Sequence, residues 1–186
     1  MNGSGMTGPI VLIGAPGAGK STVGEALAAA IGREFVDVDR VIEARAGRSI
    51  REIFVVDGEP AFREQEFVTT LEFLGRPVVL GLGGGAPMSE PIREALAGHT
   101  VVWLEVSAKH AAHRVGLDVA RPLLLGNVHG QLRKLLAERL PVYESVATHR
   151  VSTDDATPDQ VVAAVLAALG LTPSREDGPA DEHEQR

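Results

Sequence analysis

The stretch IVLIGAPGAGKST, residues 10–22, decides the fold of this 186-residue chain. Its first residues, Ile10–Ile13, are an apolar run that predicts a buried β-strand. The run leads into Gly14–Ser21, which matches the phosphate-loop pattern G-x-x-x-x-G-K-[ST] between a strand and a helix. In such a loop, backbone N–H groups and the helix N-terminus bind phosphate, Lys20 reaches the β- and γ-phosphates, and the Ser21 hydroxyl binds Mg²⁺. A glycine-rich turn without a ligand is the alternative interpretation.

The rest of the chain alternates short apolar runs with helical patterns. The predicted strands are Ile10–Ile13, Glu34–Val38, Val78–Leu82, Thr100–Val106 and His149–Ser152. The predicted helices are Lys20–Ile31, Arg40–Ala46, a short helix capped by Ser49, Pro60–Leu74, Glu90–Leu96, a helix from the cap Ser107 to Val115, His129–Val146 and Pro158–Leu169. Apolar strands separated by helices predict a parallel sheet covered on both faces, a three-layer α/β/α fold. Ligands of such sheets bind at the carboxyl ends of the strands.

Composition excludes several classes of function. Apolar residues make up 44% of the chain and the formal net charge is −7, which argues against a protein that coats nucleic acid or an anionic membrane. The chain has no cysteine, and no apolar run approaches the ~20 residues of a membrane span. The first residues lack the pattern of a secretory signal. We therefore expect a cytoplasmic protein that binds neither nucleic acid nor membrane.

The chain is predicted to form one domain with flexible ends. The domain covers residues 9–170, between a flexible leader, 1–8, and a disordered acidic tail, 171–186, which has no large apolar residue after position 172. A long loop, about 116–127, is expected to form a mobile lid. Arg121 lies in this loop, where it would neutralise charge on a phosphoryl group during transfer.

Two carboxylates close the second predicted strand, in Asp37-Val38-Asp39. Because side chains alternate along a strand, both carboxylates would point to the same side, past the strand end and toward the phosphate loop. One could hold Mg²⁺ through water while the other accepts a proton from an attacking hydroxyl. Alternatively, Asp39 caps the helix that follows.

Three glycines, Gly83, Gly84 and Gly85, follow the third predicted strand. They would let the backbone approach a ligand closely, although a flexible turn is equally consistent with them. Arg63 and Arg139 are candidates for binding a substrate carboxylate, because the guanidinium fork binds a carboxylate with two hydrogen bonds.

In combination, these motifs resemble the shikimate kinases, small phosphate-loop enzymes of the nucleoside-monophosphate-kinase-like fold, from about Pro9 to Leu169. The resemblance is carried by Gly14–Ser21, Asp37-x-Asp39, Gly47-Arg48-Ser49-Ile50, Ile53-Phe54, Asp57-Gly58-Glu59, Phe62-Arg63, Gly83–Gly85, Arg121-Pro122-Leu123 and Arg139-x-Pro141-x-Tyr143. It implies transfer of the ATP γ-phosphoryl group to the 3-hydroxyl of shikimate, on a five-stranded parallel sheet of order 2-3-1-4-5. The chain departs from the family at Ala18, where serine is frequent, and at Val38, where a small hydroxyl residue is common.

The resemblance also implies a role for each matching residue. The implied nucleotide-binding residues are Gly17, Ala18, Gly19, Lys20, Ser21, Thr22, Arg114, Arg121 and Pro158, of which Arg114 and Pro158 lie on the adenine side. The implied shikimate-binding residues are Asp39, Arg63, Gly83, Gly84, Gly85 and Arg139. Ser21 and Asp37 would hold Mg²⁺, the implied cofactor, with Asp37 acting through water. The implied catalytic residues are Lys20, Arg121 and Asp39, the last as the candidate base.

Two other classes of function stay open from the residues alone. The loop GAPGAGK is also typical of adenylate kinases, and a gluconate kinase is a further possibility. Adenylate kinases, however, usually continue with Gly-Thr where this chain has Ser21-Thr22. The second class is a non-catalytic nucleotide-binding switch, which would need no substrate clamp such as Arg63 and Arg139. We expect a monomer whose partners are ATP and shikimate.

Overall fold

The computed structural model describes residues 7–114 and 128–174, with only the backbone of residues 128 and 129. The strands are β1 (Ile10–Ile13), β2 (Phe35–Asp37), β3 (Val79–Gly81), β4 (Thr100–Glu105) and β5 (His149–Ser152). The helices are α1 (Lys20–Ala30), α2 (Val38–Ala46), α3 (Ile50–Val56), α4 (Glu59–Leu74), the 3₁₀ helix η1 (Ala86–Met88), α5 (Glu90–Ala95), α6 (Ala108–Arg114), α7 (Val128–Val146) and α8 (Pro158–Leu169). Most of the predicted leader and tail, and the predicted lid with Arg121, lie outside the described residues.

Five parallel strands form one sheet in the order β2-β3-β1-β4-β5, which confirms the predicted order. Leu12 of β1 and Asp37 of β2 both lie opposite Gly81 of β3. Ile13 of β1 lies opposite Trp103 of β4. Because the strands are parallel and in register, the loops that follow β1, β2 and β3 meet at the same edge of the sheet. Ligands of doubly covered sheets bind at this edge.

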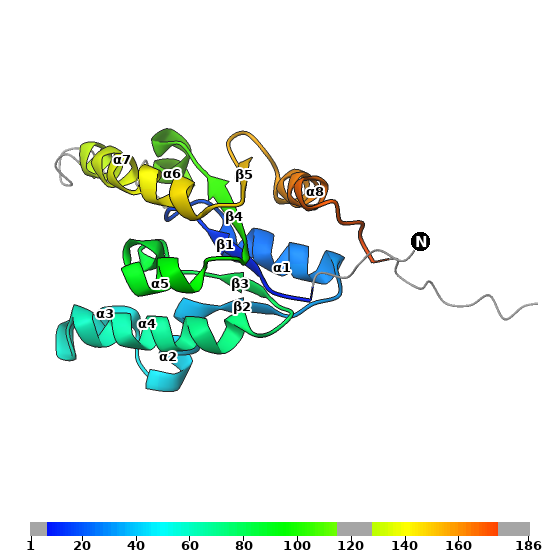
Figure 1. The fold of residues 1–186 in the computed structure, drawn as a ribbon. Coiled ribbons are helices and arrows are strands. Elements are labelled where there is room, and N and C mark those ends of the chain that lie inside the picture. Colours follow the sequence, from blue (N-terminus) through cyan, green and yellow to red (C-terminus); the bar gives the residue numbers. More distant parts are fainter. Residues whose placement is uncertain (1–6, 115–127, 175–186) are drawn as a thin grey trace, which may run out of the picture.

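Helices cover both faces of the sheet (Figure 1). On one face, α1 packs against β2 and β3, and α8 packs against β5 and α1. On the other face lie α5 and α7, and beyond β2 the helices α2, α3 and α4 pack on one another. The predicted three-layer α/β/α fold is therefore confirmed. None of the helices in the described ranges is long and apolar enough to cross a membrane.

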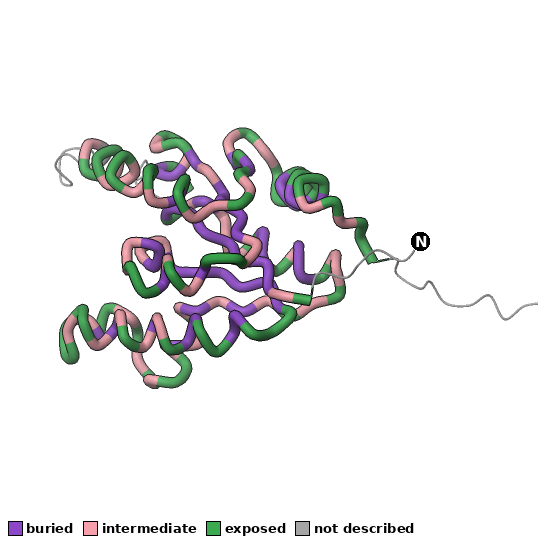
Figure 2. The backbone as a smooth tube through the Cα atoms, viewed as in Figure 1, coloured by how far each residue is buried: buried purple, intermediate pink, exposed green. Residues whose placement is uncertain are grey.

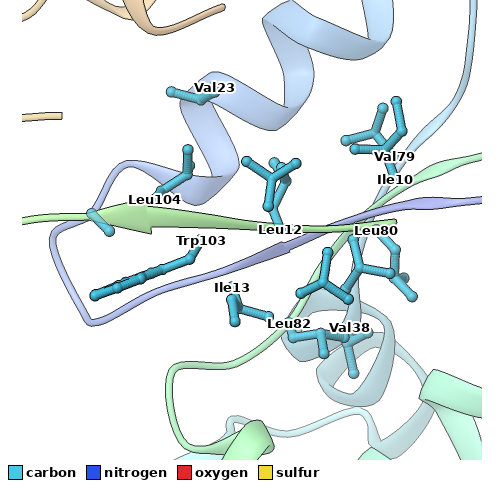
Figure 3. Close-up of a cluster of buried hydrophobic side chains, with 14 of the residues drawn as sticks. Ile10, Leu12, Ile13, Val23, Val38, Val79, Leu80, Leu82, Trp103 and Leu104 are labelled. Carbon is cyan, nitrogen blue, oxygen red and sulfur yellow. The ribbon is translucent and has the colours of Figure 1, made fainter. Parts of the chain in front are cut away.

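The sheet is the core of the molecule (Figure 2). All four residues of β1 are fully buried, and so are Leu80 and Leu104 on the neighbouring strands. Figure 3 shows Ile10, Leu12 and Ile13 of β1 together with Leu80 of β3, Leu104 of β4 and Val23 of α1. Each buried aliphatic side chain contributes about 1.5–3 kcal/mol to folding. Trp103 is 4% exposed, as its apolar strand predicts. The fully buried strand β1 leads into the phosphate loop and holds the start of that loop in place.

The chain continues to pack after the last helix. Gly170 ends α8 with a left-handed backbone, φ 63°. Four residues later, the N–H of Ser174 donates to the carbonyl oxygen of Ala30 at 2.7 Å, which fastens this segment to the end of α1. This hydrogen bond ties the backbone of residue 174 to the domain, and the domain end at residue 170 stays a prediction.

Candidate active site

The phosphate loop closes around its own lysine. Gly17 and Gly19 have left-handed backbone angles, φ 80° and 85°, which residues with side chains rarely adopt. These turns carry the chain from β1 into α1, whose first residue is Lys20. The Lys20 ammonium donates to the carbonyl oxygens of Gly14 at 2.8 Å and Ala15 at 3.1 Å. The loop thus places a cation and a helix N-terminus at the carboxyl end of the central strand.

The surroundings of Lys20 lower the affinity of its amine for a proton. Burial lowers the pKa of Lys20 to about 8, because the charged ammonium loses hydration. Asp39 and Asp37 oppose this shift, and Arg139 adds to it. An anion bound at the ammonium would restore the lost stabilisation, so the site favours an anionic ligand.

Asp37 ends β2 and caps α2. Its Oδ1 accepts hydrogen bonds from the backbone N–H groups of Asp39 at 3.1 Å and Arg40 at 3.4 Å, and the helix begins at Val38. The prediction that Asp37-Val38-Asp39 closes a strand is therefore right for Asp37 and wrong for Val38 and Asp39, because this cap turns the chain into a helix directly after Asp37. The alternative of a cap at Asp39 is also wrong, since the capping residue is Asp37.

The second oxygen of Asp37 faces the phosphate loop. Its Oδ2 accepts a hydrogen bond from the Ser21 hydroxyl at 2.8 Å. This contact joins the two residues predicted to hold Mg²⁺. A carboxylate and a hydroxyl are the hard oxygen donors that Mg²⁺ prefers, so the pair fits this ion.

Asp39 lines the same hollow as Lys20 and Ser21 from the first turn of α2. Its Oδ1 is the one buried side-chain polar atom in the described part of the chain that lacks a hydrogen-bond partner. Burial and the neighbouring Asp37 raise the pKa of this carboxyl, while Lys20 lowers it. Leaving a buried acceptor unpaired costs free energy, so this oxygen is suited to a ligand that donates a hydroxyl proton.

Gly83 makes room for two acidic side chains. A Cβ atom at this position would lie 2.9 Å from Asp39 Oδ1 and 2.9 Å from Glu66 Oε1, closer than real Cβ atoms come. Asp39 and Glu66 therefore reach the site across a bare backbone. Their close approach, and not a flexible turn, explains this glycine.

Gly84 and Gly85 each face an arginine. A Cβ atom on Gly84 would lie 3.1 Å from Pro16 Cδ of the phosphate loop and 3.5 Å from Arg139 Nη1. A Cβ atom on Gly85 would lie 3.0 Å from Arg63 Nη2. The two guanidinium groups thus lie against consecutive residues, although the arginines come from α4 and α7. The fold brings together the pair predicted to bind a carboxylate.

Glu66 is a site residue that the sequence reasoning missed. It is 1% exposed, and its Oε2 accepts a hydrogen bond from Arg63 Nη1 at 2.7 Å. Burial raises the pKa of Glu66, and the bond from Arg63 counteracts this. The sequence held a signal, because Glu66 shares the buried face of α4 with Phe62 and Phe73. A single acid on an apolar helix face needs a buried partner.

Tyr143 also had no predicted role, although it belongs to the motif Arg139-x-Pro141-x-Tyr143. Its ring is buried, and its hydroxyl donates to the carbonyl oxygen of Gly84 at 2.6 Å. The contact joins α7 to the loop of residues 83–85, called the glycine loop below. No spacing rule could show it, because the two residues lie 59 positions apart.

A second hollow lies on the α8 side of the phosphate loop. It has a volume of about 180 Å³ and is lined by Ala18, Gly19, Thr22, Val23, Arg114, Thr153, Ala156, Pro158 and Val161. Arg114 donates to the hydroxyl of Thr153 at 2.9 Å and to the carbonyl oxygen of Gly17 at 3.2 Å. Arg114 and Pro158, the two residues predicted to lie on the adenine side, are far apart in the sequence. In the structure both line this mostly apolar hollow.

The two hollows adjoin each other. The hollow that contains Lys20 and Asp39 has a volume of about 500 Å³, and Gly19, Thr22 and Arg114 line both. A ligand with an apolar base and a phosphate chain could therefore lie across the loop, with its phosphate end at Lys20. In the described ranges, no three His, Asp or Glu side chains are grouped so as to hold a metal on their own.

Comparison with known proteins agrees with this geometry. The family model described as shikimate kinase matches residues 16–170. The chain belongs to the shikimate kinase family. A shikimate kinase of Thermobifida fusca is 54% identical over 164 residues, which cover 86% of this chain and 95% of that protein. A shikimate kinase of Mycobacterium avium is 49% identical and covers 87% and 93%.

Solved structures show the same relationship. The structure of a shikimate kinase from Acinetobacter baumannii in complex with shikimate has a TM-score of 0.80 and 38% identity, over 89% of this chain and 94% of that one. A gluconokinase from Sinorhizobium meliloti, at 23% identity and a TM-score of 0.57, shares the fold alone. Family membership confirms the predicted enzyme class, an ATP-dependent kinase acting on shikimate, and decides against a non-catalytic switch.

Proposed function

We propose that the enzyme binds ATP and shikimate at the two adjoining hollows and the glycine-rich backbone of residues 83–85 beside them, and transfers the γ-phosphoryl group to the 3-hydroxyl of shikimate. One observation carries the assignment of the site. The unpaired, buried Oδ1 of Asp39 lies beside Lys20 and Gly83, and the next two residues of the loop, Gly84 and Gly85, face the guanidinium groups of Arg139 and Arg63. The site thus offers a hydroxyl acceptor and a carboxylate clamp next to a phosphate loop.

The two arginines bind the carboxylate of shikimate. Arg63 and Arg139 lie against the consecutive glycines Gly85 and Gly84, so both cations can reach one small anion. Charge-assisted bonds from a guanidinium fork are directional, and they would orient the ring of the substrate. Backbone groups of Gly83, Gly84 and Gly85 bind its hydroxyls at the same time.

ATP lies across the phosphate loop. Its base occupies the hollow beside Arg114 and Pro158, and its phosphates bind the N–H groups of Gly17 and Gly19 at the start of α1. The N–H of Ala18 donates to the carbonyl oxygen of Ala15 at 3.1 Å, so this residue helps to shape the loop. Ser21 and Asp37 would hold Mg²⁺, which neutralises charge on the phosphates. Thr22 lines both hollows and would contact the phosphate chain between them.

Asp39 and Lys20 act on the transferring group from two sides. Asp39 Oδ1 accepts the hydrogen bond of the attacking hydroxyl and orients its oxygen toward the γ-phosphate, and its raised pKa makes it the better proton acceptor. Lys20 compensates the charge of the phosphoryl oxygens. In a loose transition state, positioning and charge compensation dominate over base strength. Arg121, which lies outside the described residues, would add a cation from the predicted lid.

We place this enzyme in the cytoplasm, as a monomer.

An assay of ADP release tests this proposal. Shikimate, gluconate and AMP are offered in turn as acceptors, and we expect release to be stimulated by shikimate alone. Asp39→Asn should lower kcat by about 10²-fold, the range of one acid–base group, while ADP affinity stays within about twofold. Release that does not respond to shikimate would refute the proposed substrate. Unchanged turnover in Asp39→Asn would refute the role of that carboxylate.

A further inference from the structure

Tyr143 lies in α7 with its ring in the core and its hydroxyl at the glycine loop. The side chain is 2% exposed, and its ring packs on Trp103 with the ring centroids 5.9 Å apart. The hydroxyl donates to the carbonyl oxygen of Gly84 at 2.6 Å. Burial raises the pKa of Tyr143, so the hydroxyl keeps its proton and remains a donor at neutral pH.

The glycine loop needs such an anchor. Because glycine adopts many backbone angles at little cost, the peptide between Gly84 and Gly85 has no strong preference of its own. In a planar trans peptide, the C=O and N–H bonds point in opposite directions. Holding the oxygen of Gly84 therefore also fixes the N–H of Gly85, which points away from Tyr143. Within the described part of the chain, no protein group accepts a hydrogen bond from this N–H.

The same hydroxyl reaches the carboxylate clamp. Arg139 lies one helical turn before Tyr143, on the same face of α7. Its guanidinium lies beside the Tyr143 hydroxyl, and its Nη1 would lie 3.5 Å from a Cβ atom on Gly84. One buried hydroxyl thus contacts two elements that line the substrate position, the glycine peptide and an arginine.

We propose that Tyr143 is a positioning residue for the acceptor substrate. Its hydroxyl holds the Gly84–Gly85 peptide in the orientation that presents the Gly85 N–H to shikimate, and its position on α7 keeps Arg139 next to that peptide. Tyr143 itself does not touch the substrate. This inference rests on the proposed function, because it takes shikimate as the substrate of the loop.

Tyr143→Phe removes the hydroxyl and leaves the ring against Trp103. Without its anchor the peptide samples several orientations, so the KM for shikimate should rise about tenfold, the effect of one buried hydrogen bond. The KM for ATP and the Kd for ADP should stay within about twofold, which also shows that the variant is folded. Wild-type turnover with shikimate, measured in the same assay, tests the proposed function separately.

Two further variants separate positioning from packing. Trp103→Phe loosens the ring packing without touching the hydroxyl, so it should lower the melting temperature and leave the KM for shikimate within about twofold. In an Arg139→Ala background, Tyr143→Phe should still raise the KM for shikimate severalfold, because the glycine peptide is still released. The inference is overturned if Tyr143→Phe leaves the KM for shikimate unchanged, if Trp103→Phe raises it equally, or if the effect disappears without Arg139.

Discussion

The protonation of Lys20 should control nucleotide affinity above neutral pH. Burial lowers its pKa to about 8 in the free enzyme. A phosphate group against the ammonium favours the charged form, so binding raises this pKa and the enzyme takes up a proton. With a pKa of about 8, roughly nine-tenths of the molecules carry the charge at pH 7 and roughly one-tenth at pH 9. Affinity for ADP should therefore fall about tenfold between these pH values.

Calorimetry can measure both the affinity and the proton. ADP is titrated into the enzyme in EDTA, so that no metal contributes, at pH 7, 8 and 9 and in two buffers of different ionisation enthalpy. The uptake linked to Lys20 should increase from about 0.1 proton per ADP at pH 7 to about 0.9 at pH 9.

Lys20→Arg is the matched control for this titration. A guanidinium keeps its charge throughout this pH range, so the variant reports only the groups other than Lys20. Its absolute affinity can differ from that of the wild type, because only the slope with pH is compared. Equal proton uptake in the two proteins, or an ADP affinity of the wild type that stays constant up to pH 9, would refute the reasoning from burial.

Three further predictions follow from the structure. Gly85→Ala places a Cβ atom 3.0 Å from Arg63 Nη2, so it should raise the KM for shikimate about tenfold and leave the KM for ATP unchanged. Equal increases in the two KM values would contradict this prediction. His110 forms a hydrogen bond with Asp155 at 3.0 Å and so holds the loop that lines the hollow beside Arg114 and Pro158. His110→Ala should therefore weaken the binding of ADP severalfold and leave inhibition by tripolyphosphate unaltered. Weaker binding of both ligands would disprove this role. Deleting residues 175–186 should preserve turnover and melting temperature, because the hydrogen bond that fastens this end of the chain to α1 lies before them, and calorimetry with the kinetic assay will detect any decrease.

The fold was predictable because its signals are local. Apolar runs such as Ile10–Ile13 mark strands that helices cover on both faces, and the phosphate loop places the first strand beside the first helix. The order of the strands came from the family resemblance and was confirmed. Parallel topology then brings the loops after β1, β2 and β3 to one edge, so residues far apart in sequence were expected to meet there.

The details that escaped prediction depend on partners that spacing does not reveal. The predicted strand end at Val38 and Asp39 is instead the start of α2, because a two-residue period cannot be told from the first turn of a helix over so short a stretch. The cap made by Asp37, the last residue of β2, decides between the two. The glycines were ambiguous for a related reason. Their identity shows that side chains are excluded, but only the folded chain shows that Asp39, Arg139 and Arg63 occupy the space.

The two acidic partners of Arg63 indicate which edge of its guanidinium serves the substrate. Nη1 binds Glu66, which is 1% exposed, and breaking that pair would leave a buried charge uncompensated. The other edge, Nε and Nη2, binds one oxygen of Glu59 at 3.2 and 3.1 Å, and Glu59 is 62% exposed. An exposed ion pair of this kind contributes about 0–1 kcal/mol, so a substrate carboxylate can replace Glu59 at little cost. A Cβ atom on Gly85 would lie 3.0 Å from Nη2 and 3.3 Å from Nη1, so the nitrogen nearest Gly85 belongs to the replaceable edge. In the proposed binding mode, Glu66 therefore holds Arg63 in place, and the edge that Glu59 binds is the one that would bind shikimate.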